Sequence, residues 1–324
     1  MNETHPGDVV LNAVSRSLSG LYSASEAKIE KAFTAFLRPK LSALQPKDGE
    51  SEKDYIARFM TVFTGARWTL ARRRIARELT SARVTVNERI NSSLVEAFAA
   101  GMNEAAYTLS LSGCDMLPVT AAVVSALVAD RVISLNTTRL KTRMLLKYNE
   151  QRTQSAVHAV LAQDIAVSEF PKQAARHVVN ARKQEMIASA RAMIYGASDS
   201  GAYYAGIEAQ KSGVEIEKTW LSIMDMRVRK SHARLHGTTI PLNEKFHGDY
   251  GLLRFPHDPN AVPAEVYNCR CRMAVHPAGK SPGEYSRRLL PSQTAGYREW
   301  RERQLRKAEN ETELARLHAL RLRG

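Results

Sequence analysis

Apolar residues recur at three- and four-residue steps through most of the first two thirds of the chain. Between residues 51 and 112 these steps include Ile56, Phe59, Met60 and Phe63. Such spacing places apolar side chains on one face of an α-helix, so the pattern predicts long helices. Ser51, three residues before Asp54, is expected to cap the first helix, and Thr120 is expected to open another apolar helix.

The helical pattern continues to about residue 212 and then changes. Pro171 suits the first turn of a helix, which we expect to end near Gly196 and to be followed by a shorter helix over 202–211. After Gly213 the segment VEIEKTWLSIM alternates apolar and polar residues and contains β-branched and aromatic residues, which predicts a strand. Frequent glycine and proline residues then indicate a compact, loop-rich α+β module.

The predicted fold class is therefore a mainly α N-terminal region of long helices, followed by a small α+β module and a charged C-terminal helix. The chain divides into a partly helical N-terminal segment (1–50), a helical domain (51–212), the α+β module (213–280) and a charged helical tail (281–324). The tail has only a thin apolar stripe, which is typical of a solvated helix or one that docks on a partner.

Charge and cysteine usage narrow the class of protein. The 324 residues carry a formal net charge of +14, which favours binding to polyanions such as nucleic acid. No apolar run is long enough to span a bilayer, and the N-terminus lacks the pattern of an export signal, so we expect the chain to stay in the cytoplasm where it is made. Three cysteines, two of them separated by one residue, fit a reduced compartment better than a disulfide framework.

Arginines gather in the segment GARWTLARRRIARELTSAR. A run of this kind is often a solvated helix face. Together with the charge of the whole chain, it also suits phosphate contacts that do not depend on sequence, so double-stranded DNA is a candidate partner. The candidate DNA-binding residues are Arg67, Arg72, Arg73, Arg74 and Arg77.

Histidines and cysteines form the most distinctive candidate site. If 228–235 is helical, His232 and His236 lie one turn apart and could ligate one metal ion, with Cys269 and Cys271 as thiolate ligands of a zinc site. His276 is an alternative ligand. However, a one-residue gap in an extended strand sends the two cysteine side chains to opposite faces, which favours a core without metal over a zinc site. We therefore expect no cofactor and keep zinc as the alternative.

Other chemistry has little support in the sequence. Arg270 and Arg272 would lower the pKa of a neighbouring thiol, but no signature of a cysteine nucleophile surrounds them. The sequence has no P-loop, no dinucleotide-binding glycine turn and no GxSxG motif. We therefore name no catalytic residues. The spacing of Asp225, Arg227 and Arg229 favours a surface or inter-element ion-pair cluster, with the histidines capping a turn that ends at Gly237.

Four segments stand out in the second half of the chain, in the order ARKQEMIASARAMIYGASDSGAYYAGI, EKTWLSIMDMRVRKSH, LHG and FPHDPNAVPAEVYNCRC. Their order resembles the Mu F-type phage head morphogenesis family of minor capsid proteins. The resemblance covers about residues 175–276. The family's helical Arg-Thr-Glu element looks like Arg182 to Glu185 here, where the threonine is replaced. The residues that carry the resemblance are Trp220, Asp225, Arg227, Arg229, His232, Gly237, Phe255, Pro256, Glu265, Asn268, Cys269, Arg270 and Cys271.

This resemblance implies a low-copy minor head protein that acts in procapsid assembly at the portal vertex and can be delivered with the genome. The implied partners are the phage portal protein, other procapsid proteins and double-stranded DNA. The implied locations are the host cytoplasm during assembly and then the virion, in the capsid interior or at the portal vertex. The alternative hypothesis is a metal-dependent or toxin-like enzyme that acts on nucleic acid or nucleotide.

Overall fold

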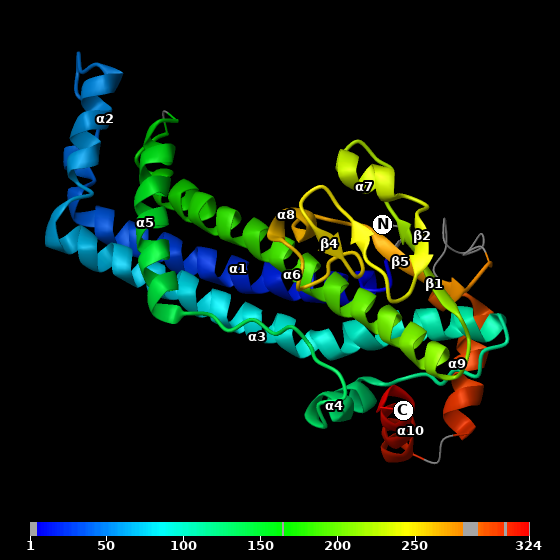
Figure 1. The fold of residues 1–324 in the computed structure, drawn as a ribbon. Coiled ribbons are helices and arrows are strands. Elements are labelled where there is room, and N and C mark those ends of the chain that lie inside the picture. Colours follow the sequence, from blue (N-terminus) through cyan, green and yellow to red (C-terminus); the bar gives the residue numbers. More distant parts are fainter. Residues whose placement is uncertain (1–4, 164, 281–290, 308–309, 324) are drawn as a thin grey trace. The chain divides into compact units, whose positions relative to one another are not determined.

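The fold is that of a computed structural model, which describes residues 5–163, 165–280, 291–307 and 310–323 (Figure 1). By its internal contacts the chain forms two compact units. The first unit contains the residues up to Val14, Ile90–Thr137 and the residues from Ala188 onward. The second contains Ser15–Arg89 and Thr138–Ile187.

Helices make up most of the described chain, which confirms the mainly α fold class. The α-helices are α1 (Asp8–Leu37), α2 (Glu52–Thr61), α3 (Gly65–Leu111), α4 (Ala121–Ala129), α5 (Thr142–Leu161), α6 (Phe170–Lys211), α7 (Lys230–Leu235), α8 (Pro263–Val266), α9 (Ala295–Lys307) and α10 (Glu311–Arg323). Short 3-10 helices are η1 (Arg38–Lys40), η2 (Ser42–Leu44) and η4 (Pro291–Gln293). No described helix is apolar over a length sufficient to cross a bilayer.

Local capping explains where two of these helices begin. The Ser51 hydroxyl accepts a hydrogen bond from the Asp54 backbone N–H at 3.2 Å, at the start of α2. The Thr120 hydroxyl likewise accepts from the Val123 N–H at 3.2 Å, at the start of α4. Each side chain satisfies a backbone donor that has no partner within the helix, and both predicted helix starts are confirmed.

The strands follow α6, as predicted. The order β2-β1-β5 defines an antiparallel sheet of β1 (Ile216–Leu221), β2 (Thr239–Pro241) and β5 (Arg272–Pro277). A separate short hairpin joins β3 (Phe246–His247) to β4 (Leu252–Leu253). Strand β1 is central and pairs with β5 from Ile216 opposite Pro277 to Leu221 opposite Arg272. This pairing places the first strand of the region in sequence, β1, beside the last strand, β5.

The prediction that a helix ends near Gly196 was wrong, because α6 continues through this residue to Lys211. A Cβ atom placed on Gly196 would lie 2.9 Å from the backbone carbonyl oxygen of His257. The glycine therefore allows a loop to approach the helix closely, and does not mark a helix end. Gly201 has the same role against the Phe98 carbonyl of α3, since a Cβ there would overlap that oxygen.

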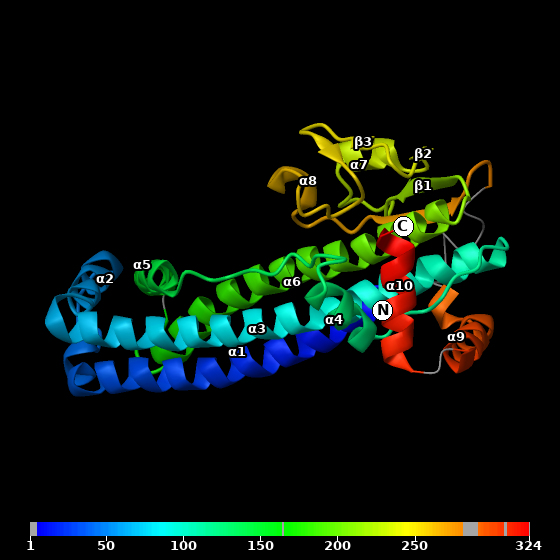
Figure 2. The same cartoon turned by 60° about the horizontal axis from the view of Figure 1, so that its bottom comes forward.

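The core of the first unit joins the sheet to the helices. Leu242, Met273 and Val275 from the sheet region are buried in one cluster with Ala202 and Ala205 of α6. Figure 2 shows the strands alongside this part of α6. Gly206 permits the close packing, since a Cβ there would contact Leu242 and Val275 at 3.0 Å. A second cluster lies within the sheet region itself and consists of Trp220, Leu235, Phe246, Leu253, Cys269 and Cys271.

The core of the second unit is aromatic. Phe170 packs against Phe59 with ring centroids 5.2 Å apart and against Phe63 at 5.4 Å, and Phe63 meets Trp68 edge to face at 5.0 Å. Large rings of this kind bury much apolar surface per residue. The independent folding of the predicted module 213–280, which lies inside the first unit, stays a prediction. The predicted tail 281–324 begins with residues 281–290, which lie outside the described residues.

Candidate functional site

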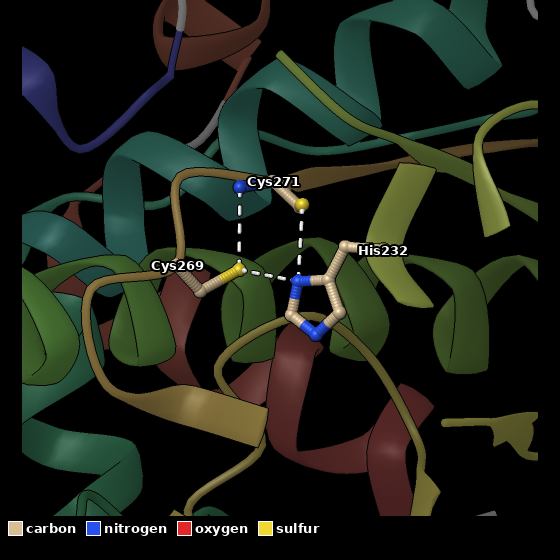
Figure 3. A group of neighbouring side chains, drawn as sticks. All are labelled: His232, Cys269 and Cys271. Atoms are coloured by element: carbon tan, nitrogen blue, oxygen red, sulfur yellow. Dashed lines mark hydrogen bonds between the residues drawn. The ribbon is translucent and has the colours of Figure 1, made fainter. Parts of the chain in front are cut away.

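The central strand and two flanking turns position a histidine and two cysteines. His232 lies in α7, which follows β1, whereas Cys269 and Cys271 lie in the segment between α8 and β5. All three side chains are buried. The Nδ1 atom of His232 lies 3.4 Å from the Sγ atom of Cys269 and 3.6 Å from that of Cys271, so the ring faces both thiols (Figure 3).

The prediction that the two cysteines point to opposite faces was wrong. Residues 269–271 precede β5 and are not extended strand. Asn268 adopts a left-handed backbone with φ of 58°, which turns the chain just before Cys269. The Cys271 backbone N–H then donates to the Cys269 sulfur at 3.4 Å, so the tripeptide folds back and directs both sulfurs to His232 (Figure 3).

A buried carboxylate holds the other side of the His232 ring. The Nε2 atom of His232 lies 2.9 Å from Oε2 of Glu265, which is fully buried in α8. The second oxygen of Glu265 accepts the Tyr250 backbone N–H at 2.7 Å. A Cβ on Gly248 would overlap this carboxylate, so the glycine leaves room for it. Glu265 therefore fixes the imidazole with its Nδ1 atom toward the thiols.

The two thiols differ in charge. The pKa of Cys271 is lowered to about 4 by its hydrogen bond with the Cys269 thiol, and further by those with His232 and Ser222. The pKa of Cys269 is raised well above its ordinary value by the same bond with Cys271 and by burial. Burial alone would lower the pKa of His232, but hydrogen bonds with Cys271 and Glu265 outweigh burial and raise it. A thiolate, the form that binds metals, is therefore accessible at Cys271 near neutral pH.

Trp220 and Ser222 support α7 from the end of β1. The buried Trp220 indole meets the His232 ring edge to face, with centroids 5.2 Å apart, and its Nε1–H donates to the Ser222 hydroxyl at 3.0 Å. The same hydroxyl donates to the His232 backbone carbonyl at 2.6 Å. After α7, Gly237 takes a φ of 80°, a left-handed conformation that favours glycine and lets the chain return toward β2.

The charged motif residues form the outer part of the site. Both guanidinium nitrogens Nη1 and Nη2 of Arg270 donate to the Asp225 carboxylate at 2.7 Å. This hydrogen bonding lowers the pKa of Asp225 to about 2. Arg227 is more exposed and lies 3.9 Å from the same carboxylate. Arg229 instead donates to the backbone carbonyls of Glu265 and Tyr267, so it fixes the turn that carries the site.

A pocket of about 80 Å³ opens beside the thiols. Its lining combines the imidazole and both cysteines with three arginines, and contains no carboxylate. The lining residues are Ile223, Arg227, Val228, Arg229, His232, Asn268, Cys269, Arg270 and Cys271.

The structure does not bring the other predicted histidines to this site. His236 is exposed at the C-terminal end of α7, and its Nδ1 atom accepts the Ser222 backbone N–H at 3.0 Å. Helix α7 ends before His236, so this residue does not share a helical face with His232. The Nε2 atom of His276 lies 2.8 Å from the Thr219 hydroxyl in the sheet. Of the predicted metal ligands, the structure therefore groups His232, Cys269 and Cys271.

A second buried group was missed by the sequence analysis. Asp199 lies between two imidazoles, 2.9 Å from His257 Nδ1 and 3.4 Å from His5 Nε2. Burial alone would raise the pKa of Asp199, but the charge of His5 and the hydrogen bond from His257 lower it. His257 also donates from Nε2 to the Cys269 backbone carbonyl at 2.9 Å, which attaches the cysteine loop to α6. No local pattern joins residues so distant in sequence.

The five predicted DNA-binding arginines lie on α3 in two sets. Arg72 and Arg73 approach the Glu150 carboxylate at 4.0 and 3.7 Å. Arg67, Arg74 and Arg77 are exposed, and no acidic side chain within the described residues forms an ion pair with them. Their spacings of seven and three residues place them on one helix face. We call these three residues the α3 arginine face.

Comparison with known proteins identifies the region that carries the site. Residues 151–274 match the family described as Phage Mu protein F like protein. The chain therefore has a Mu F-like region, and the resemblance predicted from the sequence is confirmed for these residues. The match begins within α5, earlier than predicted, and it includes His232, Cys269 and Cys271.

A curated relative shares a shorter stretch. The NAD(+)--arginine ADP-ribosyltransferase EFV of Enterococcus faecalis (strain ATCC 700802 / V583) is 33% identical over 79 residues. This stretch is 23% of the present chain and 15% of that protein. The chain thus spans a small part of this relative's length. No solved structure matches the chain.

Proposed function

We propose that this chain is a minor head protein that acts at the portal vertex during procapsid assembly. The observation that carries the proposal is the Mu F-like match over residues 151–274. The partners are the portal protein and other procapsid proteins, and the site of action is the assembling head in the host cytoplasm and later the virion.

The test of this assembly role is copurification with the portal. The full chain is co-expressed with the portal protein of the same phage, and portal rings are isolated by size exclusion. We expect a fixed, low ratio of this chain to portal subunits that survives moderate salt. Free chain in the late fractions, with none on the rings, would reject the portal role. Loss of the chain from particles that have ejected their genome would support delivery with the DNA.

We further propose that the α3 arginine face binds duplex DNA without sequence preference. Exposed guanidinium groups on one helix face can each neutralise a phosphate and release its condensed counterion. Arg72 and Arg73 are already close to Glu150, so they are expected to contribute less. This division assigns the binding to Arg67, Arg74 and Arg77.

The test is the salt dependence of binding to a random-sequence duplex. The triple variant Arg67→Gln, Arg74→Gln, Arg77→Gln should flatten the log–log salt slope by about 2 to 3, because each lost phosphate contact removes about 0.9. A control variant removes the same charge from α9, at Arg298, Arg303 and Arg306. If both variants change the slope equally, binding follows net charge and not the α3 arginine face.

A second candidate function is an enzyme that acts on nucleic acid or nucleotide. The observation that favours it is the pocket, where Arg227, Arg229 and Arg270 surround the thiols and would suit a phosphate group. Titration of the full chain with NAD⁺ and ATP tests this function. Saturable binding that is lost in Arg227→Gln would support it, whereas the absence of nucleotide binding would reject it.

A further inference from the structure

The buried side chains of His232, Cys269 and Cys271 have the nitrogen–sulfur separations of a tetrahedral metal site. Zinc binds sulfur at about 2.3 Å and nitrogen at about 2.0–2.1 Å, so tetrahedral angles place the two ligand atoms about 3.5–3.6 Å apart. The two observed distances from His232 Nδ1 to sulfur are 3.4 and 3.6 Å. All three ligand atoms lie within 4.8 Å of one another.

Hydrogen bonding alone leaves the three groups imperfectly satisfied. The Glu265 carboxylate can only accept at Nε2 of His232, so the Nε2 atom carries a proton. The Nδ1 atom then offers either one lone pair or one proton, and it faces two sulfur atoms. One lone pair or one proton forms one good hydrogen bond, whereas a single cation can bind the nitrogen and both sulfurs together.

We propose that His232 Nδ1, Cys269 Sγ and Cys271 Sγ bind one zinc ion, with the fourth position open to the adjacent pocket. Two thiolates balance the charge of the divalent ion, and the protons that Cys269, Cys271 and His232 Nδ1 hold before binding pass to solvent. A set of two soft thiolates and one imidazole at tetrahedral separations suits zinc better than the hard cations magnesium or calcium. The proposal does not depend on a role in head assembly.

The surroundings are organised as those of known histidine–metal sites. The ring nitrogen opposite the ligand atom is bonded to a buried carboxylate, an arrangement that fixes the ring and raises its basicity. The backbone N–H of Cys271 donates to the Cys269 sulfur, which stabilises negative charge there. A pocket of about 80 Å³ beside the ligands can admit water to the fourth position.

The group of His5, Asp199 and His257 is the rival buried cluster, but most of its polar atoms already have hydrogen-bond partners. Both ring nitrogens of His257 have acceptors, Asp199 at one side and the Cys269 carbonyl at the other. His5 Nδ1 accepts the Gly7 backbone N–H at 3.0 Å. His257 therefore has no free ring nitrogen for an ion, and it anchors the loop that carries Cys269.

The experiment measures zinc in the full chain, purified without a histidine tag and dialysed against metal-free buffer. We expect about one zinc per chain, and a fall of about ten-fold or more in Cys271→Ser and His232→Ala, because each variant loses a direct ligand. Cys114→Ser is the matched control, since Cys114 is a free cysteine outside the cluster. A folded wild-type chain without zinc, even after reconstitution, would overturn the proposal, as would unchanged zinc in both ligand variants.

A second measurement avoids the risk that ligand variants fail to fold. In the wild-type chain, added zinc should slow the reaction of two of the three cysteines with a thiol reagent, and in Cys114→Ser it should slow both remaining ones. Glu265→Gln should weaken zinc affinity about 10- to 100-fold, as expected for a residue that orients a ligand. Equal reactivity of the thiols with and without zinc would overturn the proposal.

Discussion

Glu104 on α3 allows a sharp test of how burial controls charge in this protein. The side chain is 6% exposed and lies among the apolar residues of the first unit. One carboxylate oxygen accepts the Ser292 backbone N–H at 3.0 Å, and within the described structure the other has no hydrogen-bond partner. Burial raises the pKa of Glu104 from 4.5 to about 7. The hydrogen bond from Ser292 and the positive charge of Arg272 both lower this pKa, but burial outweighs them.

The sign of the effect follows from proton linkage. The folded state holds the Glu104 proton more tightly than the unfolded state, so the associated stability is full below pH 4.5 and is lost as the pH rises through about 7. At about 1.36 kcal/mol for each tenfold change in proton activity, the loss between about pH 5 and about pH 8 comes to about 2.5 kcal/mol. Glu104→Gln stays neutral and has a shape close to that of the protonated acid, so it should not suffer this loss.

The assay is urea unfolding across this pH range, followed by circular dichroism and tryptophan fluorescence. The free energy of unfolding of Glu104→Gln minus that of wild type should rise by about 2 to 3 kcal/mol from about pH 5 to about pH 8. Because the test uses this change and not the absolute difference, any constant effect of the amide cancels. Glu96→Gln, at an exposed position of α3, is the matched control and should leave the pH dependence unchanged. A difference that stays flat with pH for Glu104→Gln would refute the reasoning.

Two further outcomes are expected from packing. Gly201→Ala should destabilise the chain by about 1 to 3 kcal/mol or more, because the new Cβ would overlap the Phe98 carbonyl. Gly20→Ala should stabilise α1 by about 0.5 to 1 kcal/mol, because a Cβ at Gly20 meets open space. Thermal unfolding of both variants checks this, and equal effects would contradict the close helix contact. In limited proteolysis of the full chain, residues 213–280 should persist as one fragment because they enclose their own buried cluster, and early cuts scattered within them would contradict a separately folded module.

The sequence predicted the features that depend on local pattern. Apolar spacing located the helical segment that contains α3, Pro171 located the start of α6, and the change to alternation located β1. Ser51 and Thr120 were recognised as helix starts because a cap acts on a backbone donor only three residues away. The arrangement of the cysteines was not predictable by the same means, because it depends on the left-handed backbone of Asn268 and not on the one-residue gap alone.

Features that join distant segments could not be read from local pattern. Gly196 looked like a helix end, yet its role is to admit the His257 backbone. Asp199 gains its two histidine partners only when the N-terminal segment and the loop before α8 fold against α6. Glu265 belonged to the recognised motif, but its bond to His232 became visible only in three dimensions.

The pairing of β1 with β5 has a consequence for whether this region can be inserted into other proteins. Ile216 and Pro277 lie opposite each other, so the chain enters and leaves the sheet region at neighbouring points. A segment with adjacent ends can be inserted into a loop of another protein with little disturbance of its host. We therefore expect residues 216–277 to tolerate insertion into another protein. Grafting them into a surface loop of an unrelated protein should leave the fold of that protein intact.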